Sequence, residues 1–205
     1  MFTVFIVDDD AGVLRALSRL LRAKGYDTRP FMSPQEFLEH HDAAVPGCAV
    51  LDVSMPDLDG LELQQALTAG GTQRPVIFIT GKGDIPTSVR AMKAGAIDFL
   101  TKPVSEVDLL DAIDRAKRRD AGDRQIQAEL TLIQAKIASL TPREREVLTH
   151  VVAGRLNKQI AGDLGTAEKT IKVHRSRMME KLGVRTVADL IRLAEKAGIS
   201  VQVNT

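Results

Sequence analysis

Three consecutive aspartates, Asp8, Asp9 and Asp10, end an apolar run in the stretch "FIVDDDAG" at residues 5–12. Two carboxylates about 4 Å apart repel each other by about 4 kcal/mol at an effective dielectric of about 20. The chain must therefore either turn these side chains apart or hold a cation between them. The first alternative is a solvated turn with a helix cap, and the second is a site for a hard cation such as Mg²⁺.

The acids follow the first of five short apolar runs that alternate with helix-like segments up to about residue 118. This alternation is typical of a parallel sheet flanked by helices, so we predict an α/β fold with a flavodoxin-like, doubly wound, five-stranded parallel sheet. Helices are expected at 11–24 and 34–41. The second run is weakly apolar and contains Pro30, which predicts an edge strand. The predicted strands are residues 3–7, 26–31, 48–52, 75–80 and 96–100.

Polar side chains occupy the points where these predicted strands end. Ligands of open parallel sheets bind beyond the carboxyl ends of the strands, and strands one and three are neighbours in a flavodoxin-like order. An aspartate beside Mg²⁺ can act as a nucleophile toward phosphorus, a lysine can neutralise the developing charge, and a threonine can hydrogen-bond phosphoryl oxygens. The parts for phosphoryl transfer are therefore present at this rim, in Asp8, Asp9, Asp10, Asp52, Thr80 and Lys102.

Length and composition limit the number of domains, the class of partner and the location that we expect. At 205 residues, the chain is long enough for two domains with separate cores. Residues 1–120 carry 14 Lys and Arg against 18 Asp and Glu, a net charge of −4, whereas residues 121–205 carry 14 against 9, a net charge of +5. The basic half suits a polyanionic partner. Without an apolar stretch of about 18 residues, a cytoplasmic protein with no membrane partner is expected, and Cys48 is expected to be a buried thiol.

The second half has the pattern of a helical bridge followed by a compact helical domain. Residues 118–139 are polar with a narrow apolar stripe, which predicts an extended helix that joins the domains or, alternatively, also pairs with another helix. A capping box follows, with Thr141 as N-cap, Pro142 at the first helical position and Glu144 at the third. Four helices are predicted after it, and the middle two meet at a turn that contains Gly165, which is helix-turn-helix spacing.

The third of these four helices has an apolar face and a basic face. Ile171, Met178 and Leu182 are predicted to pack inward. On the other face, lysines can contact phosphates or guanine edges and an exposed valine suits a thymine methyl group. A basic face can also be merely solvated, but the glycine turn and the basic half of the chain favour a recognition helix. The predicted DNA-contacting residues are Lys169, Thr170, Lys172, Val173, Arg175, Ser176 and Arg177.

Four segments of the first half resemble the receiver domains of two-component response regulators. They occur in the family's order and together span residues 1–120. The segments are "VDDD" after the first strand, "LDVSMPDLDG" around Asp52, "FITGKGD" at Thr80 and "AGAIDFLTKP", which ends at Pro103.

This resemblance implies roles for the acids. Asp52 would be the phosphoacceptor, and Asp9 and Asp52 would coordinate Mg²⁺ directly together with the backbone carbonyl of Ser54. Asp8 would assist through water. Asp10 is then left as the predicted N-cap of the helix that begins at residue 11, where it would accept a backbone N–H and meet the positive end of the helix dipole.

The resemblance also implies a phosphorylation switch. Thr80 and Lys102 would contact the phosphoryl group, and the Lys102–Pro103 peptide bond is expected to be cis. Phosphorylation would reposition Thr80 and Phe99 and reshape the surface from about residue 87 to residue 117. The family often has Tyr where this chain has Phe99, so a hydroxyl-mediated signal is not expected. Two positions beside the pocket, expected to tune the lifetime of the phosphoryl group, are Gly81 and Lys82.

Residues 140–199 look like the LuxR-type helix-turn-helix domain, through "LTPREREVL", "GRLNKQIAGDLG" and "KTIKVHRSRMMEKLGV". Joined to the receiver, they resemble full-length regulators of the NarL/FixJ subfamily. The implied domains are a receiver at 1–118, a helical linker at 119–139 and a DNA-binding domain at 140–205.

One residue departs from the LuxR pattern. Relatives commonly have a capping Ser or Thr where this chain has Ala167, so Thr166 is expected to cap the recognition helix one residue early. The family also implies partners for the whole chain: a sensor histidine kinase as phosphodonor, promoter DNA, RNA polymerase, and a second copy of the chain. The last helix, around 187–193, is expected to self-associate on DNA.

The main hypothesis is thus a phosphorylation-activated transcriptional regulator, with no enzyme activity beyond the phosphorylation and dephosphorylation of its own Asp52. Two other hypotheses remain. "DDDAG" resembles the Asp-x-Asp pair of haloacid-dehalogenase-type phosphatases with Asp8 as nucleophile, and steady phosphomonoester turnover lost in Asp8→Asn but retained in Asp52→Asn would favour that enzyme. A DNA binder that does not depend on phosphate would keep the same operator affinity after phosphorylation.

Overall fold

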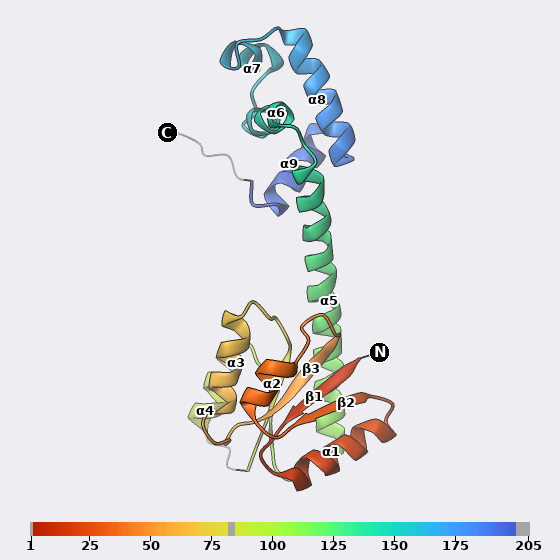
Figure 1. The fold of residues 1–205 in the computed structure, drawn as a ribbon, viewed down its shortest axis with the longest axis vertical. Coiled ribbons are helices and arrows are strands. Elements are labelled where there is room, and N and C mark those ends of the chain that lie inside the picture. Colours follow the sequence, from red (N-terminus) through yellow and green to blue (C-terminus); the bar gives the residue numbers. More distant parts are fainter. Residues whose placement is uncertain (1, 82–84, 200–205) are drawn as a thin grey trace. The chain divides into compact units, whose positions relative to one another are not determined.

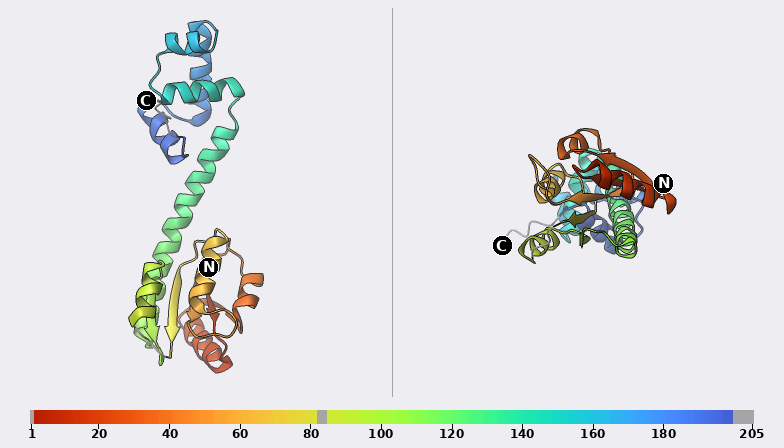
Figure 2. Two further views of the ribbon diagram at one scale, coloured as in Figure 1. Left: turned by 90° about the vertical axis from the view of Figure 1, so that its left-hand side faces the viewer. Right: turned by 90° about the horizontal axis from the view of Figure 1, so that it is seen from below.

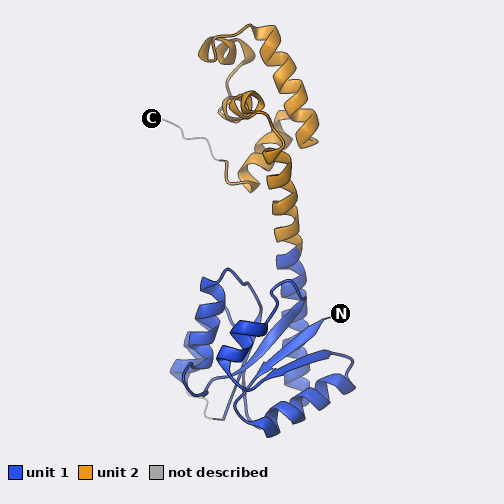
Figure 3. Ribbon diagram, viewed as in Figure 1, with its two compact units in different colours: residues 1–124 blue, residues 125–205 orange. Residues whose placement is uncertain are grey.

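The computed structural model describes residues 2–81 and 85–199, so Lys82 lies outside the described residues. The chain divides into two compact units, residues 1–124 and residues 125–205 (Figure 3). No helix in the described part of the chain is long and apolar enough to cross a membrane. The two units are described separately below.

The first unit is built on a five-stranded parallel sheet with the strand order β2-β1-β3-β4-β5 (Figure 1). This order confirms that β1 and β3 are neighbours and that the strand containing Pro30 lies at an edge. The fifth strand begins two residues later than the sequence predicts. The strands are β1 (Thr3–Val7), β2 (Asp27–Phe31), β3 (Gly47–Asp52), β4 (Val76–Thr80) and β5 (Asp98–Thr101).

Helices cover both faces of this sheet and form two hydrophobic cores (Figure 2). Side chains alternate between the faces of a strand, so Phe5 and Val7 pack toward α2, α3 and α4, whereas Val4 and Ile6 pack toward α1 and α5. Cys48 is fully buried, as expected, and burial raises the pKa of its thiol to about 12. The helices are α1 (Ala11–Ala23), α2 (Pro34–His40), α3 (Gly60–Ala69), α4 (Ile85–Lys93) and α5 (Glu106–Ala138).

Helix α5 confirms the predicted extended helix over 118–139 and shows that it continues the last helix of the first unit without a break. Near the boundary between the units, Arg124 pairs with the buried Asp120 at 2.9 Å. Its guanidinium also donates to three carbonyl oxygens of the loop before β3, at 2.8–2.9 Å, in Ala43, Ala44 and Val45. Bonds from a charged donor are the stronger kind, so Arg124 fixes this part of α5 to the first unit.

The second unit packs α6 (Pro142–Val152), α7 (Asn157–Asp163), α8 (Glu168–Leu182) and α9 (Val187–Lys196) around one core. The predicted inward residues Ile171, Met178 and Leu182 are fully buried in it. The capping box at Thr141 is also confirmed, because its hydroxyl accepts from the Glu144 N–H and the Glu144 carboxylate accepts from the Thr141 N–H. The cap predicted for α8 is wrong: Ala167 is the N-cap residue and no side chain caps this helix.

Candidate metal centre and nucleic-acid interface

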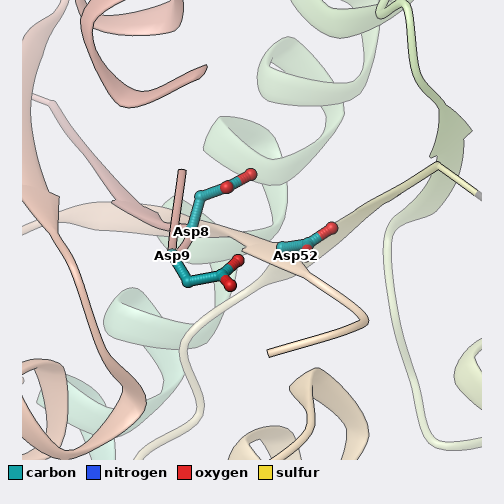
Figure 4. A group of neighbouring side chains, drawn as sticks. All are labelled: Asp8, Asp9 and Asp52. Atoms are coloured by element: carbon teal, nitrogen blue, oxygen red, sulfur yellow. The ribbon is translucent and has the colours of Figure 1, made fainter. Parts of the chain in front are cut away.

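The aspartates predicted to form a site do lie together, at the carboxyl ends of β1 and β3 (Figure 4). Val7 pairs with Leu51 in the sheet, so the residues that follow these two positions emerge side by side. One carboxylate oxygen each from Asp8, Asp9 and Asp52 lies within 4.8 Å of the others. Asp8 and Asp52 are buried, and Asp9 is exposed.

Among the described residues, Lys102 is the cation that contacts this cluster. Its Nζ lies 2.7 Å from Asp8 Oδ2, where it donates a hydrogen bond, and 3.1 Å from Asp52 Oδ1. Burial raises the pKa of Asp8 above its usual value, although the bonds from Lys102 and the Asp10 N–H oppose that shift. Burial lowers the pKa of Lys102, but its contacts with both carboxylates outweigh that effect and the pKa is raised. One ammonium group thus serves two buried carboxylates.

The cluster has the charge and the ligand atoms that a hard divalent cation requires. In the part of the chain that the structure describes, its carboxylates outnumber the one ammonium group that contacts them, and oxygen is the ligand that Mg²⁺ prefers. Asp52 Oδ1 is enclosed and, apart from its ion pair with Lys102, has no well-aligned hydrogen bond among the described residues. A buried polar atom of this kind needs a further partner. The residues therefore fit a bound cation.

Asp10 is separated from this cluster, as the sequence predicts. Its carboxylate oxygen accepts from the Gly12 N–H at 2.6 Å and the Val13 N–H at 3.4 Å, so it caps the N-terminus of α1. Its own N–H donates to Asp8 Oδ1 at 2.9 Å. The helix cap is therefore confirmed for Asp10, and Asp8 and Asp9 lie with Asp52 at the rim, where the cation site stays a prediction.

The other predicted rim residues lie around the cluster. Thr80 ends β4 and is fully buried, and its carbonyl accepts from the Lys102 N–H at 2.7 Å. Phe99 is half-buried and packs against Phe78 with the ring centroids 6.3 Å apart. The Lys102–Pro103 peptide bond is cis, as expected. Ser54 follows β3 with an exposed side chain, and Gly81 is exposed.

Sequence reasoning missed Gly60, which starts α3 behind the cluster. A Cβ at this position would lie 2.3 Å from the Asp52 backbone oxygen. Any side chain here would therefore force the backbone of Asp52 to move. The N–H of Gly60 also donates to Val53 O at 3.1 Å, which folds the intervening loop back on itself. A usable signal was present: Asp59 and Glu62 form a capping box around this glycine.

The predicted DNA-contacting residues lie on α8, which follows α7 after a short turn. Gly165 in this turn has φ +60°, a left-handed conformation that glycine adopts without strain. Arg175 is half-buried and donates to Asn157 Oδ1 at 3.0 Å, and Lys172 pairs with Glu168 at 3.2 Å. The remaining predicted side chains are exposed to solvent: Lys169, Thr170, Val173, Ser176 and Arg177.

Comparisons with known proteins agree with both units. The response regulator receiver domain matches residues 4–114, and the luxR family of bacterial regulatory proteins matches residues 138–194. The fold and motifs thus define a response regulator with a LuxR-type DNA-binding domain. The chain belongs to this family, in the NarL/FixJ subfamily whose members include FixJ.

Individual relatives align over almost the whole chain. Nodulation protein W of Bradyrhizobium diazoefficiens is 44% identical over 197 residues, which are 96% of this chain and 87% of that protein. The structure of the response regulator StyR is 49% identical with a TM-score of 0.82, and the match covers 95% of this chain and 98% of that one. Full-length FixJ from B. japonicum is 38% identical with a TM-score of 0.58 and coverages of 97% and 98%.

Proposed function

We propose that this response regulator accepts a phosphoryl group on Asp52 from a sensor histidine kinase and then binds promoter DNA as a homodimer. The observation that carries the proposal is the buried Asp52 carboxylate, held 3.1 Å from the Lys102 ammonium beside two further carboxylates. The domains are assigned as a receiver at 1–118, a linker at 119–139 and a DNA-binding domain at 140–205. RNA polymerase is a further proposed partner, and the proposed location is the cytoplasm.

The chemistry is an in-line transfer of the phosphoryl group. An Asp52 carboxylate oxygen attacks phosphorus, and a P–O bond forms as the P–N bond to the kinase imidazole breaks. The imidazole nitrogen keeps the bonding pair and takes up a proton from solvent. Lys102 neutralises charge on the phosphoryl oxygens, and Thr80 hydrogen-bonds them. Attack of water on the same phosphorus returns Asp52 and releases inorganic phosphate.

Mg²⁺ is the proposed cofactor of this transfer. Asp9, Asp52 and the backbone carbonyl of Ser54 would hold the ion directly, and Asp8 would act through water. The ion, when bound, supplies positive charge to the transferred oxygens. A role for Asp8 as the nucleophile of a phosphatase is disfavoured, because both of its oxygens already accept hydrogen bonds and the side chain is fully buried.

Phosphorylation would act by shifting an existing equilibrium between two receiver conformations. Thr80 and Phe99 are the proposed switch residues, with Gly81 and Lys82 as proposed modulators of the phosphoryl lifetime. The half-buried Phe99 ring packs against the edge of a hydrophobic core and is partly open to solvent, which supports a ring that can adopt two positions.

Labelling with a small phosphodonor tests the phosphoacceptor. With phosphoramidate and Mg²⁺, we expect the wild-type chain to gain one acid-labile, hydroxylamine-sensitive phosphoryl group and Asp52→Asn to gain none. Asp57→Asn is the matched control, because Asp57 lies in the same loop with φ +66°, a conformation that Asn tolerates. Stoichiometric labelling of Asp52→Asn would overturn the assignment.

The proposed DNA interface is the exposed face of α8, with Lys169, Thr170, Lys172, Val173, Ser176 and Arg177, joined by Arg175. Arg175 would hold α8 against α7 through Asn157 and present its remaining guanidinium nitrogens to a phosphate. Self-association on DNA is proposed for α9, around 187–193.

Salt dependence separates the roles of these residues. Lys172→Ala should weaken binding to DNA and reduce the slope of log K against log salt by about one unit if Lys172 contacts a phosphate. A loss of base preference with an unchanged slope would instead indicate a base contact. The control is Lys24→Ala in the first unit, because Lys24 is exposed, lies outside the proposed interface and forms only an exposed surface pair with Glu106. Unchanged affinity, slope and base preference in Lys172→Ala would show that the face is misplaced.

A further inference from the structure

A groove on the first unit lies apart from the acid cluster. It runs between α1 and the segment that leads from β2 into α2, and it has a volume of about 520 Å³. Ligand sites for small molecules commonly have volumes of about 300–1,000 Å³. The groove therefore has the size of a small-molecule site.

The floor of the groove is apolar. It is lined by the buried Leu14, by Pro30 of the edge strand and by Met32, whose side chain is large and yet 48% exposed. Ser18, which is buried, also lines the groove. An apolar group that covers the exposed methionine and the apolar floor removes their surface from water, which lowers the free energy of the complex.

The rim of the groove is basic. Arg15 and Arg19 are one helical turn apart on α1, so their guanidinium groups lie along the same side of the helix. Neither forms a hydrogen bond or an ion pair within residues 2–81 and 85–199. Arg22 closes one end, where its Nε donates to Thr28 Oγ1 at 2.7 Å. The one acid at the groove, Glu36, accepts from the Met32 N–H at 2.9 Å.

A second cavity of the first unit shows that this arrangement is not general. It has a similar volume, about 570 Å³, and is also lined by arginines, Arg74, Arg115 and Arg119. Arg115 and Arg119 each pair with an aspartate, and the buried Arg74 donates hydrogen bonds to backbone carbonyls. Exposed arginines that have neither a hydrogen bond nor an ion pair among the described residues are thus found at the α1 groove and not in that cavity.

We propose that the α1 groove binds a small organic carboxylate with an apolar body. The carboxylate would lie between Arg15 and Arg19, because planar guanidinium groups match the geometry of a carboxylate. The apolar body would cover Leu14, Pro30 and Met32. Charge complementarity selects an anion, and the volume selects a small molecule. An acidic segment of a partner protein is the competing occupant.

Methyl NMR of the full chain tests this proposal with hexanoate as the probe. The chain has six methionines, so Met32 can be assigned by its loss in Met32→Leu. Hexanoate should shift the Met32 methyl with a dissociation constant on the order of 1 mM, the range expected for so small a ligand. Hexanamide, which has the same shape and no charge, should bind at least about tenfold more weakly. Equal shifts with both compounds, or none with hexanoate, would overturn the proposal.

Matched variants locate the anion. Arg15→Gln/Arg19→Gln should weaken hexanoate binding by about tenfold, and Arg15→Lys/Arg19→Lys should restore part of the loss. Arg119→Gln, in the cavity with paired arginines, should leave binding unchanged. Neither arginine of the α1 groove contacts another described residue through a hydrogen bond, so the fold should tolerate these changes. Unchanged affinity in Arg15→Gln/Arg19→Gln would contradict the proposal.

Discussion

The two units each contain a buried carboxylate in contact with a lysine, and the two pairs behave in opposite ways. Lys102 Nζ lies 2.7 Å from Asp8 Oδ2 in the first unit, and Lys181 Nζ lies 2.7 Å from Glu144 Oε2 in the second. The pKa of Asp8 is raised, chiefly by burial. The pKa of Glu144 is lowered, chiefly by the hydrogen bond from Lys181 and then by the Thr141 N–H.

The two pairs differ in the number of carboxylates that each lysine contacts. Lys181 contacts one carboxylate, and Glu144 also receives the capping N–H, so the acid has the donors it needs. Lys102 is shared between Asp8 and Asp52 beside the exposed Asp9, so negative charge is in excess within the part of the site that the structure describes. A pair with balanced charge holds helices together, whereas a cluster with excess negative charge suits the cation and the phosphoryl transfer that we propose.

Removing the shared lysine should have the largest effect. Lys102→Met should slow phosphorylation of the full chain by phosphoramidate and Mg²⁺ about a hundredfold, because the developing charge on the phosphoryl oxygens loses its cation. The rate is measured by quenched-flow or mass analysis of the phosphorylated chain. Lys181→Met serves as the control and should react at the wild-type rate. Comparable rates in Lys102→Met and the wild type would show that the two lysines do not differ in this way.

Removing the other lysine should affect stability instead. Lys181→Met leaves Glu144, 3% exposed, without its charged partner, and should destabilise the second unit by about 2 kcal/mol. Amide hydrogen exchange in α6 and α8 measures this change without requiring the whole chain to unfold in one step. Exchange in β1 and β3 of the first unit should stay the same. Protection in α6 equal to that of the wild type would mean that the pair contributes little.

The pH dependence of the second unit sharpens the comparison with a smaller effect. Since the pKa of Glu144 is lowered on folding, its contribution to stability is present above the ordinary glutamate value and is lost as pH falls through the folded value. The wild-type unit should therefore lose stability below about pH 4.5, and Glu144→Gln should lack this part of the loss. Amide exchange in α6 between about pH 5 and pH 3 reports it. Parallel pH profiles for the two chains would contradict the assignment.

Much of the fold could be predicted from local patterns. Alternating apolar runs predict the strands, the position of Pro30 predicts the edge, and the ends of the strands predict the cluster of Asp8, Asp9 and Asp52. The helix caps at Asp10 and Thr141 are also local, because each depends on neighbours within three residues. These features follow from spacing along the chain and from the geometry of parallel sheets.

The features that could not be predicted involve partners far apart in the sequence. Glu144 and Lys181 are 37 positions apart, and Arg124 reaches carbonyls about 80 positions away. Arg175 is predicted to contact DNA, but its guanidinium also donates a hydrogen bond to Asn157 on the preceding helix. Such contacts depend on how helices pack, which single-residue patterns do not encode.

Binding of DNA with and without phosphorylation tests the central claim most directly. DNA sites are first selected by the phosphorylated chain from a random pool, and affinity for the best site is then measured for the wild type and Asp52→Asn, each with Mg²⁺ and with or without phosphoramidate. The account predicts that phosphoramidate tightens binding by the wild type at least about tenfold and leaves Asp52→Asn unchanged. Equal affinities of the wild type in both conditions, or the same tightening in Asp52→Asn, would contradict it.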